Sequence, residues 1–307
     1  MKKVFVNCAL NDSQKERLQN VSDEYVFVYE PEEDVEVIIG NYAPNKMKDF
    51  TNLKWFQASA VGVDNYVKRG ILNDDVVMTN AVDIHSLEVA QHTFAMVVSM
   101  LKNLHLYRDN QSEASWKDEG KVKDFKKVKV AIIGFGDIGN QVAEMLKALG
   151  MYIIGVKRTL VDKPAYVDEL YTNDDLLKAI SDVDVVVSIL PGTKETYHLF
   201  TKDTFKAMRS DAILINVGRG TLYDEEVLKE VLDEGIIKAA GADVFAVEPL
   251  SEDSPLWKTK NFVVTPHVAG FFHVDTALDS FVDLVEENLK RYINGEELKY
   301  VVSERVD

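Results

Sequence analysis

Residues 128–159 constrain the fold of this chain more than any other stretch, because they read as a strand, a tight turn, a helix and a second strand. Residues 128–133 are apolar apart from Lys129, which is typical of a strand buried on both faces of a parallel sheet. Residues 138–149 carry apolar side chains at three- and four-residue spacing, which predicts a helix with one buried face. Residues 152–156 then predict the second strand of a βαβ unit.

The turn in this unit contains Gly134, Gly136 and Gly139, in the spacing G-x-G-x-x-G. The first glycine permits a sharp turn, the second lets the backbone approach a pyrophosphate, and the third lets the helix pack closely on the strand. Glycines can also serve a turn alone, but their place between a strand and a helix favours a dinucleotide site at the helix N-terminus. Further cofactor contacts are expected beside this turn and at later strand ends, from Asp137, Ile138, Pro191, Thr196, Val217, Gly218 and Gly270.

Three polar residues follow the second strand, where the residue that reads the adenosine ribose is expected. They are Lys157, Arg158 and Thr159. An acidic residue there would accept hydrogen bonds from a 2′-hydroxyl and repel a 2′-phosphate. Two cations and a hydroxyl would instead attract and bind a 2′-phosphate. We therefore expect NADPH to be preferred and NADH to remain possible. The alternative is that Lys157 and Arg158 are ordinary solvated charges.

Composition narrows the class of protein. With 307 residues and 46% hydrophobic content, the chain can bury the cores of two domains. Its 51 acidic and 35 basic residues give a formal net charge of −16, which opposes nucleic acid and anionic membranes as partners. The single cysteine, Cys8, excludes an intrachain disulfide and suits a reducing cytoplasm. We expect Cys8 to be a small buried residue in a strand.

No segment predicts export or membrane insertion. The apolar run near the N-terminus is too short and too polar for a signal peptide. The longest apolar segment, residues 94–101, is far shorter than the roughly 18 residues that span a bilayer. We therefore expect a cytoplasmic protein without a membrane partner.

The remaining chain alternates between predicted strands and helices. Residues 1–80 contain short apolar runs between polar or helical stretches, which predicts a small α/β domain with a mostly parallel sheet. Residues 108–127 resemble a linker. Alternation after the linker predicts a doubly wound sheet. Its expected helices lie near 173–180, 203–208, 224–234 and 275–293, and its expected strands at 183–190, 212–217, 239–244 and 262–265.

Residues 86–107 predict one long helix with a wide apolar face and Ser86 as its cap. We expect so apolar a helix to be buried between domains or subunits. His85 and His92 stand seven residues apart, but no third ligand accompanies them at metal spacing. We therefore expect two structural or hydrogen-bonding histidines and no metal site.

Polar residues that could take part in catalysis follow three of the predicted strands. Ligands of doubly wound sheets sit at the carboxyl ends of strands. Arg219 can hold a carboxylate or carbonyl, Glu248 can orient an imidazole, and His267 can donate a proton near neutral pH. Singly, they read as a surface cation, a turn acid and a capping residue. Their joint position at strand ends favours a catalytic set.

The motifs GFGDIG at 134, NVGRG at 216, DVFAVEPL at 243 and TPHVAG at 265 carry a resemblance. In this order and spacing they resemble the D-isomer-specific 2-hydroxyacid dehydrogenase family, and the likeness extends to ASAVGVDNY at 58–66. The segment GVKRT resembles the NADP-preferring branch. The resemblance implies two doubly wound domains, a Rossmann nucleotide-binding domain (99–274) inserted in a flavodoxin-like substrate domain (1–98 plus 275–307). It also implies a homodimer built partly on the helix at 86–107.

The resemblance implies a role for each motif residue. Arg219 would bind the carboxylate and carbonyl of the substrate, and Glu248 would hold His267 protonated. His267 would then give its proton to the 2-oxo group as hydride arrives from the cofactor. Asp243 would contact the nicotinamide carboxamide. The amides around Val61 and Gly62 would hold the substrate carboxylate.

These observations together predict an NADPH-preferring reductase that converts a 2-oxo acid into an (R)-2-hydroxy acid. Glyoxylate, hydroxypyruvate and larger 2-oxo acids all remain open as substrates. One alternative is a 3-phosphoglycerate dehydrogenase, although no extra cations for a substrate phosphate stand out. The other is a nucleotide-sensing binding protein on the same fold.

Overall fold

The computed structural model describes residues 1–270 and 272–303, and the chain divides into two compact units. The first unit comprises Met1–His85 and Phe271–Asp307, and the second comprises Ser86–Gly270. The chain thus leaves the first unit, builds the second, and returns. Each unit is an α/β layer structure of the predicted class.

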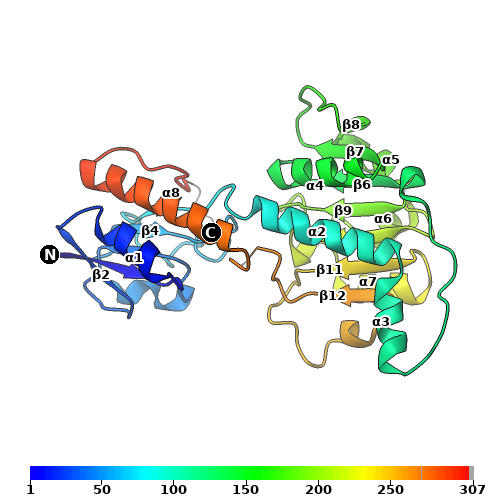
Figure 1. The fold of residues 1–307 in the computed structure, drawn as a ribbon, viewed down its shortest axis with the longest axis horizontal. Helices are drawn as coiled ribbons and strands as arrows, with labels where there is room; N and C mark the ends of the chain where they lie inside the picture. The colour runs from blue at the N-terminus through cyan, green and yellow to red at the C-terminus, as the bar shows by residue number, and fades with distance from the viewer. Residues whose placement is uncertain (271, 304–307) are drawn as a thin grey trace. The chain divides into compact units, whose positions relative to one another are not determined.

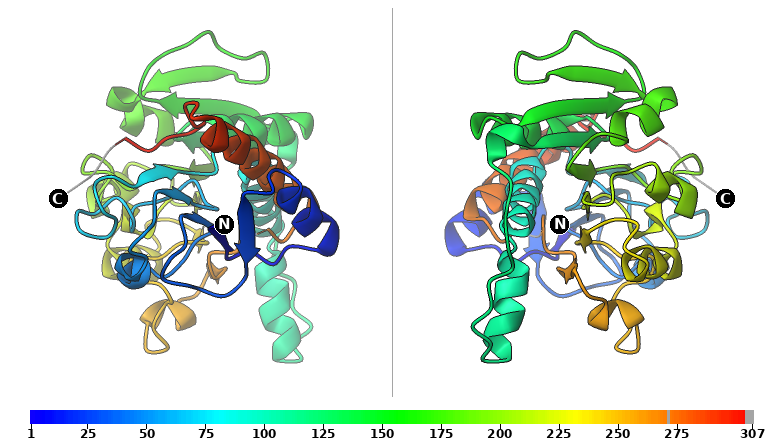
Figure 2. Two further views of the ribbon diagram at one scale, coloured as in Figure 1. Left: turned by 90° about the vertical axis from the view of Figure 1, so that its left-hand side faces the viewer. Right: turned by 90° about the vertical axis from the view of Figure 1, so that its right-hand side faces the viewer.

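The first unit contains a parallel sheet of five strands in the order β2-β1-β3-β4-β5. This is the flavodoxin-like strand order, as predicted. Helices α1 (Asp12–Gln19) and α8 (Asp275–Asn294) lie on one face of the sheet in Figures 1 and 2. Their side chains contribute to the apolar core on that face. Its strands are β1 (Lys2–Val6), β2 (Tyr25–Val28), β3 (Val37–Ile39), β4 (Trp55–Gln57) and β5 (Val77–Thr79), and a 3₁₀ helix, η1, spans Pro44–Asp49.

The second unit contains a parallel sheet of seven strands in the order β12-β11-β10-β9-β6-β7-β8. Numbered from β6, this is the order 3-2-1-4-5-6 of the dinucleotide-binding fold, extended by β12 at the far edge. The strands are β6 (Lys129–Ile133), β7 (Tyr152–Lys157), β8 (Glu169–Thr172), β9 (Val185–Ser188), β10 (Ile213–Asn216), β11 (Ala239–Ala242) and β12 (Phe262–Val264).

Helices cover both faces of this second sheet. Side chains of α2 (Ser86–Leu101) and α4 (Asp137–Ala148) share one apolar core with the sheet, and the two helices lie on one face in Figure 1. A second apolar core forms on the other face. Its helices are α5 (Leu176–Ile180), α6 (Lys202–Lys206) and α7 (Glu225–Asp233). Short 3₁₀ helices occur at Phe125–Lys127, Asn173–Asp175, Gly220–Leu222 and Pro255–Lys258.

The prediction of a single helix over residues 86–107 is wrong. The chain instead forms α2 and a separate α3 (Leu104–Ser112), because Asn103 between them adopts a left-handed conformation with φ of 56°. Lys238 donates to the Asn103 side chain at 3.1 Å, which stabilises the break. Helix α2 is packed against the sheet, whereas α3 has no buried residue and projects from the end of α2 (Figure 2).

The predicted domain limits at 98/99 and 274/275 also differ from the observed division at 85/86 and 270/271. The first limit moves because α2 belongs entirely to the second unit, where Val97 and Met100 are buried in the core shared with α4. Strand β8 was not predicted. Cys8 lies beyond the end of β1 at Val6 rather than in a strand, and burial raises the pKa of its thiol to about 12. Among the described residues, no helix has the length and apolarity to cross a membrane.

Candidate functional site

The register of the second sheet brings the predicted motifs to one edge. Ser188 of β9 pairs with Ile133 of β6 and with Asn216 of β10. Ala242 of β11 pairs with Asn216 and with Val264 of β12. Since the strands are parallel and end in register, the loops that follow them lie side by side. Such an edge, where the chain order reverses between β6 and β9, is where ligands bind in doubly wound sheets.

The glycine turn after β6 fits a dinucleotide. Gly134 has φ of 85°, and a Cβ there would lie 2.7 Å from the carbonyl oxygen of Ile189, so only glycine is accommodated. Gly136, the N-cap of α4, is exposed, and the nearest atom to a Cβ there would be 4.0 Å away. The turn is therefore tight on its inner side and open at the helix N-terminus, which suits the approach of a pyrophosphate. Asp137 is also exposed there, and Ile138 is half-buried.

The two loops on either side of this turn carry further residues that were predicted to bind the cofactor. Lys157 ends β7 half-buried, and Arg158 and Thr159 are exposed. Across β6, the hydroxyl of Thr196 closes the turn after β9 by donating to the carbonyl of Pro191 at 2.6 Å. In that turn, a hydrogen bond with Thr193 and the positive charge of Arg158 help to hold the pKa of Glu195 below its usual range.

His267 and Glu248 form the central pair of the site. The imidazole Nδ1 of His267 lies 2.6 Å from Oε2 of Glu248, and Oε1 accepts from the N–H of Phe245 at 2.9 Å. The hydrogen bond to Glu248 raises the pKa of His267 above its ordinary value. Burial opposes ionisation of Glu248, but the bonds from His267 and Phe245 keep the pKa of its carboxyl lowered. The geometry therefore favours an imidazolium beside a carboxylate.

Arg219 joins this pair from the loop after β10. Its charge lowers the pKa of Glu248 and opposes the rise in the pKa of His267, so the three groups act on one another. The adjacent Gly220 is required by close packing, because a Cβ there would lie 1.9 Å from the carbonyl carbon of Phe245. Arg219 itself donates to the carbonyl of Gly218 at 2.8 Å. The structure therefore brings Arg219, Glu248 and His267 together, as the motifs suggested.

Other predicted cofactor residues differ in how open they are. Val217 and Gly218, which precede Arg219 in the chain, are buried, whereas Gly270 is half-exposed. Asp243 is only 1% exposed, and its carboxylate accepts hydrogen bonds from Thr265, Val268 and Ala269. Asp243 thus holds the loop that carries His267, a contact that sequence reasoning did not foresee. Its role toward the carboxamide of the nicotinamide remains a proposal.

Val61 and Gly62 belong to the first unit, in the loop after β4. The carbonyl of Ala60 accepts from the N–H of Ala81 at 3.2 Å, and that of Val61 accepts from the Asn80 side chain at 3.0 Å. In a planar trans peptide the carbonyl and the following N–H point in opposite directions. The N–H groups of Val61 and Gly62 therefore point away from Ala81 and Asn80.

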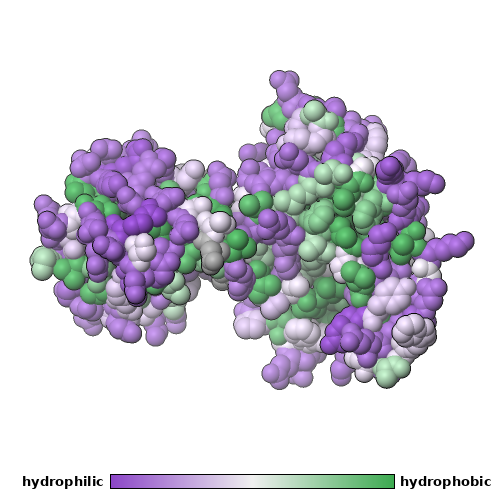
Figure 3. Space-filling view, viewed as in Figure 1, coloured by the Kyte–Doolittle hydropathy of each residue, from purple (hydrophilic) through white to green (hydrophobic). Residues whose placement is uncertain are grey.

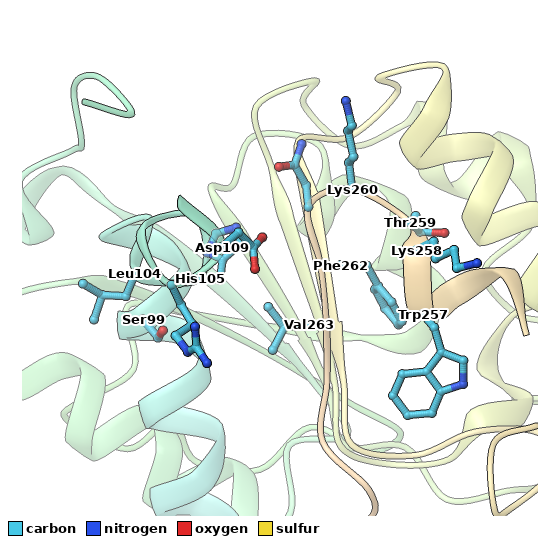
Figure 4. Close-up of a pocket in the computed structure, with 12 residues that line it drawn as sticks. Ser99, Leu104, His105, Asp109, Trp257, Lys258, Thr259, Lys260, Phe262 and Val263 are labelled. Carbon is cyan, nitrogen blue, oxygen red and sulfur yellow. The ribbon is translucent and has the colours of Figure 1, made fainter. Parts of the chain in front are cut away.

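A separate recess of about 530 Å³ lies at the opposite end of β12 from His267. Figure 4 shows side chains from α3 and from the segment before β12 around it, among them His105, Asp109 and Trp257. Partial burial lowers the pKa of His105, whose Nδ1 has no partner among the described residues. The recess is not part of the carboxyl-edge site. In the described part of the chain, no group of three or more His, Cys, Asp or Glu is arranged to hold a metal ion.

A dinucleotide turn beside an acid–base pair and an arginine defines a nicotinamide-dependent oxidoreductase on a doubly wound α/β fold. The chain belongs to the D-isomer-specific 2-hydroxyacid dehydrogenase family. The family model described as "D-isomer specific 2-hydroxyacid dehydrogenase, NAD binding domain" matches residues 94–269. The predicted family, enzyme class and NAD(P) cofactor class are thereby confirmed.

Individual members of this family are also similar to the chain in sequence or structure. A glyoxylate reductase of Thermococcus gammatolerans is 32% identical over 80% of this chain and 75% of its own length. A D-3-phosphoglycerate dehydrogenase of Methanocaldococcus jannaschii is 30% identical over 82% of this chain but only 48% of its own. Among solved structures, an NADPH-dependent glyoxylate/hydroxypyruvate reductase of Sinorhizobium meliloti, in complex with NADP and sulfate, is 25% identical, covers 99% of both chains and has a TM-score of 0.82.

Proposed function

We propose that this protein reduces a small 2-oxo acid to the (R)-2-hydroxy acid with NADPH. The observation that carries the proposal is the 2.6 Å pair between Nδ1 of His267 and Oε2 of Glu248, set at the carboxyl edge of the sheet near Arg219. A carboxylate-held imidazolium is a proton donor suited to neutral pH. The names of the glyoxylate and hydroxypyruvate reductases among the similar proteins support a small substrate.

Each loop and side chain of the site has its own role in this reaction. The loops after β6, β7 and β9 hold the cofactor, which supplies the hydride when it is bound. Arg219 binds the carboxylate and 2-oxo oxygen of the substrate through its planar guanidinium. Because Nδ1 of His267 is engaged by Glu248, the other ring nitrogen, Nε2, delivers the proton to that oxygen. One hydride at C2 and one proton at oxygen complete the hydroxy acid. Glu248 stabilises the imidazolium before transfer.

We attribute the NADPH preference to Lys157, Arg158 and Thr159. Two cations and a hydroxyl at the end of β7 can bind a 2′-phosphate through charge-assisted hydrogen bonds, each worth about 1.5–3 kcal/mol. The exposed Glu195, whose pKa the charge of Arg158 helps to lower, offers an opposing charge. It moderates the preference and is consistent with residual use of NADH. We also assign cofactor contacts to the exposed or half-exposed Asp137, Ile138, Pro191, Thr196 and Gly270, to the neighbouring Val217 and Gly218, and to Asp243.

We further propose that the N–H groups of Val61 and Gly62 bind the substrate carboxylate. Within the first unit their peptides are oriented by Ala81 and Asn80, as described above. Asn80→Leu removes the bond to the Val61 carbonyl and should raise the KM for the 2-oxo acid while leaving the KM for NADPH unchanged. An unchanged substrate KM would refute the assignment.

We propose that the protein is a homodimer that associates through α2 and α3. Helix α3 has no buried residue, and Leu104 and Tyr107 on it are 53% and 37% exposed. Figure 3 shows apolar residues gathered on the face of the second unit that carries α2 and α4. An unpartnered helix with exposed apolar side chains next to such an area is typical of an interface.

We also propose a cytoplasmic location. The support is the single thiol of Cys8, half-buried and held un-ionised by its raised pKa, which forms no intrachain disulfide. Fractionation of cells that express the untagged chain tests this, since recovery outside the cytoplasmic fraction would contradict it.

The decisive experiment is absorbance at the reduced-nicotinamide band with purified protein, either cofactor, and a panel of 2-oxo acids from glyoxylate to phenylpyruvate. Faster oxidation of NADPH than of NADH with a small 2-oxo acid is the expected result. The panel should include 3-phosphohydroxypyruvate, because one relative is a phosphoglycerate dehydrogenase. Preference for it would favour that function. Tight cofactor binding without any oxidation would favour a nucleotide-sensing protein instead.

A further inference from the structure

His92 lies on α2, and none of the roles assigned above uses it. Its side chain is 23% exposed. Its Nε2 lies 3.1 Å from Oγ1 of Thr265 and 3.7 Å from Oδ1 of Asp243. Thr265 begins the loop that carries His267, and Asp243 holds that loop. His92 therefore connects α2 with the loop that carries the proton donor.

The direction of these hydrogen bonds follows from what each group can donate. The Thr265 hydroxyl has one hydrogen and lies 2.6 Å from Oδ1 of Asp243. Asp243 accepts from the N–H groups of Val268 at 3.0 Å and Ala269 at 3.1 Å, so its carboxylate is the acceptor throughout. The hydroxyl therefore donates to Asp243, and its oxygen must accept from His92. Nε2 of His92 consequently carries a hydrogen.

The loop that this chain of bonds secures needs such support. His267 has φ of 53°, in the left-handed region that residues other than glycine seldom adopt. A conformation of this kind persists only where the surrounding structure enforces it. Asp243 binds the loop two residues before His267, through Thr265, and again after it, through Val268 and Ala269. The rotamer of Thr265 decides whether the first of these bonds forms.

We propose that His92 is a positioning residue for the proton-transfer step. Its Nε2–H fixes the Thr265 hydroxyl toward Asp243, and this holds His267 in the orientation that Glu248 and the substrate require. His92 acts through Thr265 and does not touch the substrate. The inference rests on the proposed reductase function for its kinetic consequence, but the hydrogen-bond assignment stands on the geometry alone.

The assignment can be tested without activity. In protein labelled with ¹⁵N at the imidazole nitrogens, the His92 resonances are identified by their loss in His92→Gln. The expected spectrum shows Nε2 of His92 bearing a hydrogen at neutral pH. An unprotonated Nε2, with the hydrogen on Nδ1, would overturn the proposal.

Kinetics test the consequence. His92→Phe removes the donor and should lower kcat about tenfold, the loss typical of one hydrogen bond, with little change in either KM. His92→Gln keeps an N–H at similar reach and should retain most of the activity. Thr265→Val should match His92→Phe, and Thr265→Ser should not. The neighbouring, exposed Gln91 provides the control, because Gln91→Ala should leave kcat unchanged.

A double-mutant cycle separates this role from general damage to the fold. His92→Phe combined with Thr265→Val should be no slower than Thr265→Val alone, because both act through one hydroxyl. Multiplying effects, or equal losses in His92→Phe and His92→Gln, would refute the positioning role. A wild-type chain without reductase activity would refute the proposed function, and the NMR experiment would still decide the hydrogen bond.

Discussion

His267 and Glu248 stand 19 residues apart in the chain, yet Nδ1 of His267 and Oε2 of Glu248 are 2.6 Å apart. The contact arises because β11 and β12 are adjacent and in register, so their following loops meet. Its electrostatic result is a raised pKa for His267 and a lowered pKa for Glu248. The pair therefore keeps the imidazole of His267 protonated beside the position assigned to the substrate.

The pH dependence of reduction should follow His267. Because its pKa is raised in the folded protein, His267 stays protonated at pH values where a free imidazole has lost its proton. Reduction should be fastest below this pKa and fall as pH rises through it, and oxidation of the hydroxy acid should show the reverse. Initial rates measured from pH 5 to 10 check this, and a flat profile would count against His267 as the donor.

Glu248→Gln should move that descending limb to lower pH, because the negative charge that stabilises the imidazolium of His267 is lost. At neutral pH the rate should fall about tenfold as the protonated fraction shrinks and the imidazole loses its orientation. The exposed Glu252 in the same loop supplies the control, since Glu252→Gln should leave the limb in place. An unshifted limb in Glu248→Gln would show that Glu248 does not affect the pKa of the group that titrates.

Arg219→Lys should raise the KM for the 2-oxo acid at least tenfold. A lysine keeps the charge but cannot present the planar fork that binds a carboxylate through two parallel bonds. Arg209, which forms such a fork with Asp211 away from the motif loops, provides the matched control. Steady-state kinetics of both variants should show the KM effect in Arg219→Lys alone.

Arg158→Ala should weaken NADPH about tenfold and leave NADH nearly unchanged, because only the phosphorylated cofactor loses a charge-assisted bond. Cofactor titrations by protein fluorescence measure both affinities. Lys178→Ala, on α5, removes a positive charge elsewhere in the same unit and should change neither. Equal losses for the two cofactors would show that Arg158 does not read the 2′-phosphate.

Gly220→Ala should abolish activity and destabilise the second unit by several kcal/mol. The added Cβ would lie 1.9 Å from the carbonyl carbon of Phe245, so the Arg219 and Glu248 loops must move apart. Gly235→Ala is the comparison, because Gly235 has φ of 65° with open space around it and should cost only about 1 kcal/mol. Urea unfolding curves of the two variants give the difference.

Leu104→Glu should convert the proposed dimer into a monomer. A charge in the middle of an apolar interface is costly because it is buried without a partner. Leu177 on α5 is 55% exposed, close to the 53% of Leu104, so Leu177→Glu is a control of equal exposure. Sedimentation velocity should show dissociation only for Leu104→Glu, and a dimeric Leu104→Glu would place the interface elsewhere.

Local patterns in the sequence determined much of this protein. The apolar run before Gly134 and the three glycines specify a strand, a turn and a helix by their own chemistry, and the structure has them at β6 and α4. Arg219, Glu248 and His267 could be chosen because each follows a predicted strand, and parallel strands end at one edge. Each of these inferences uses residues close in the chain, for which periodicity and residue type suffice.

The tertiary structure decided what depends on contacts between distant residues. The break at Asn103 is held by Lys238, 135 positions away, so an apolar pattern continuing through it could only suggest one helix. The carboxylate of Asp243 is committed to Thr265, Val268 and Ala269, which no spacing indicates. The bond from His92 to Thr265 spans 173 positions. Side-chain direction and sheet register set these contacts, and both exist only after the chain has packed.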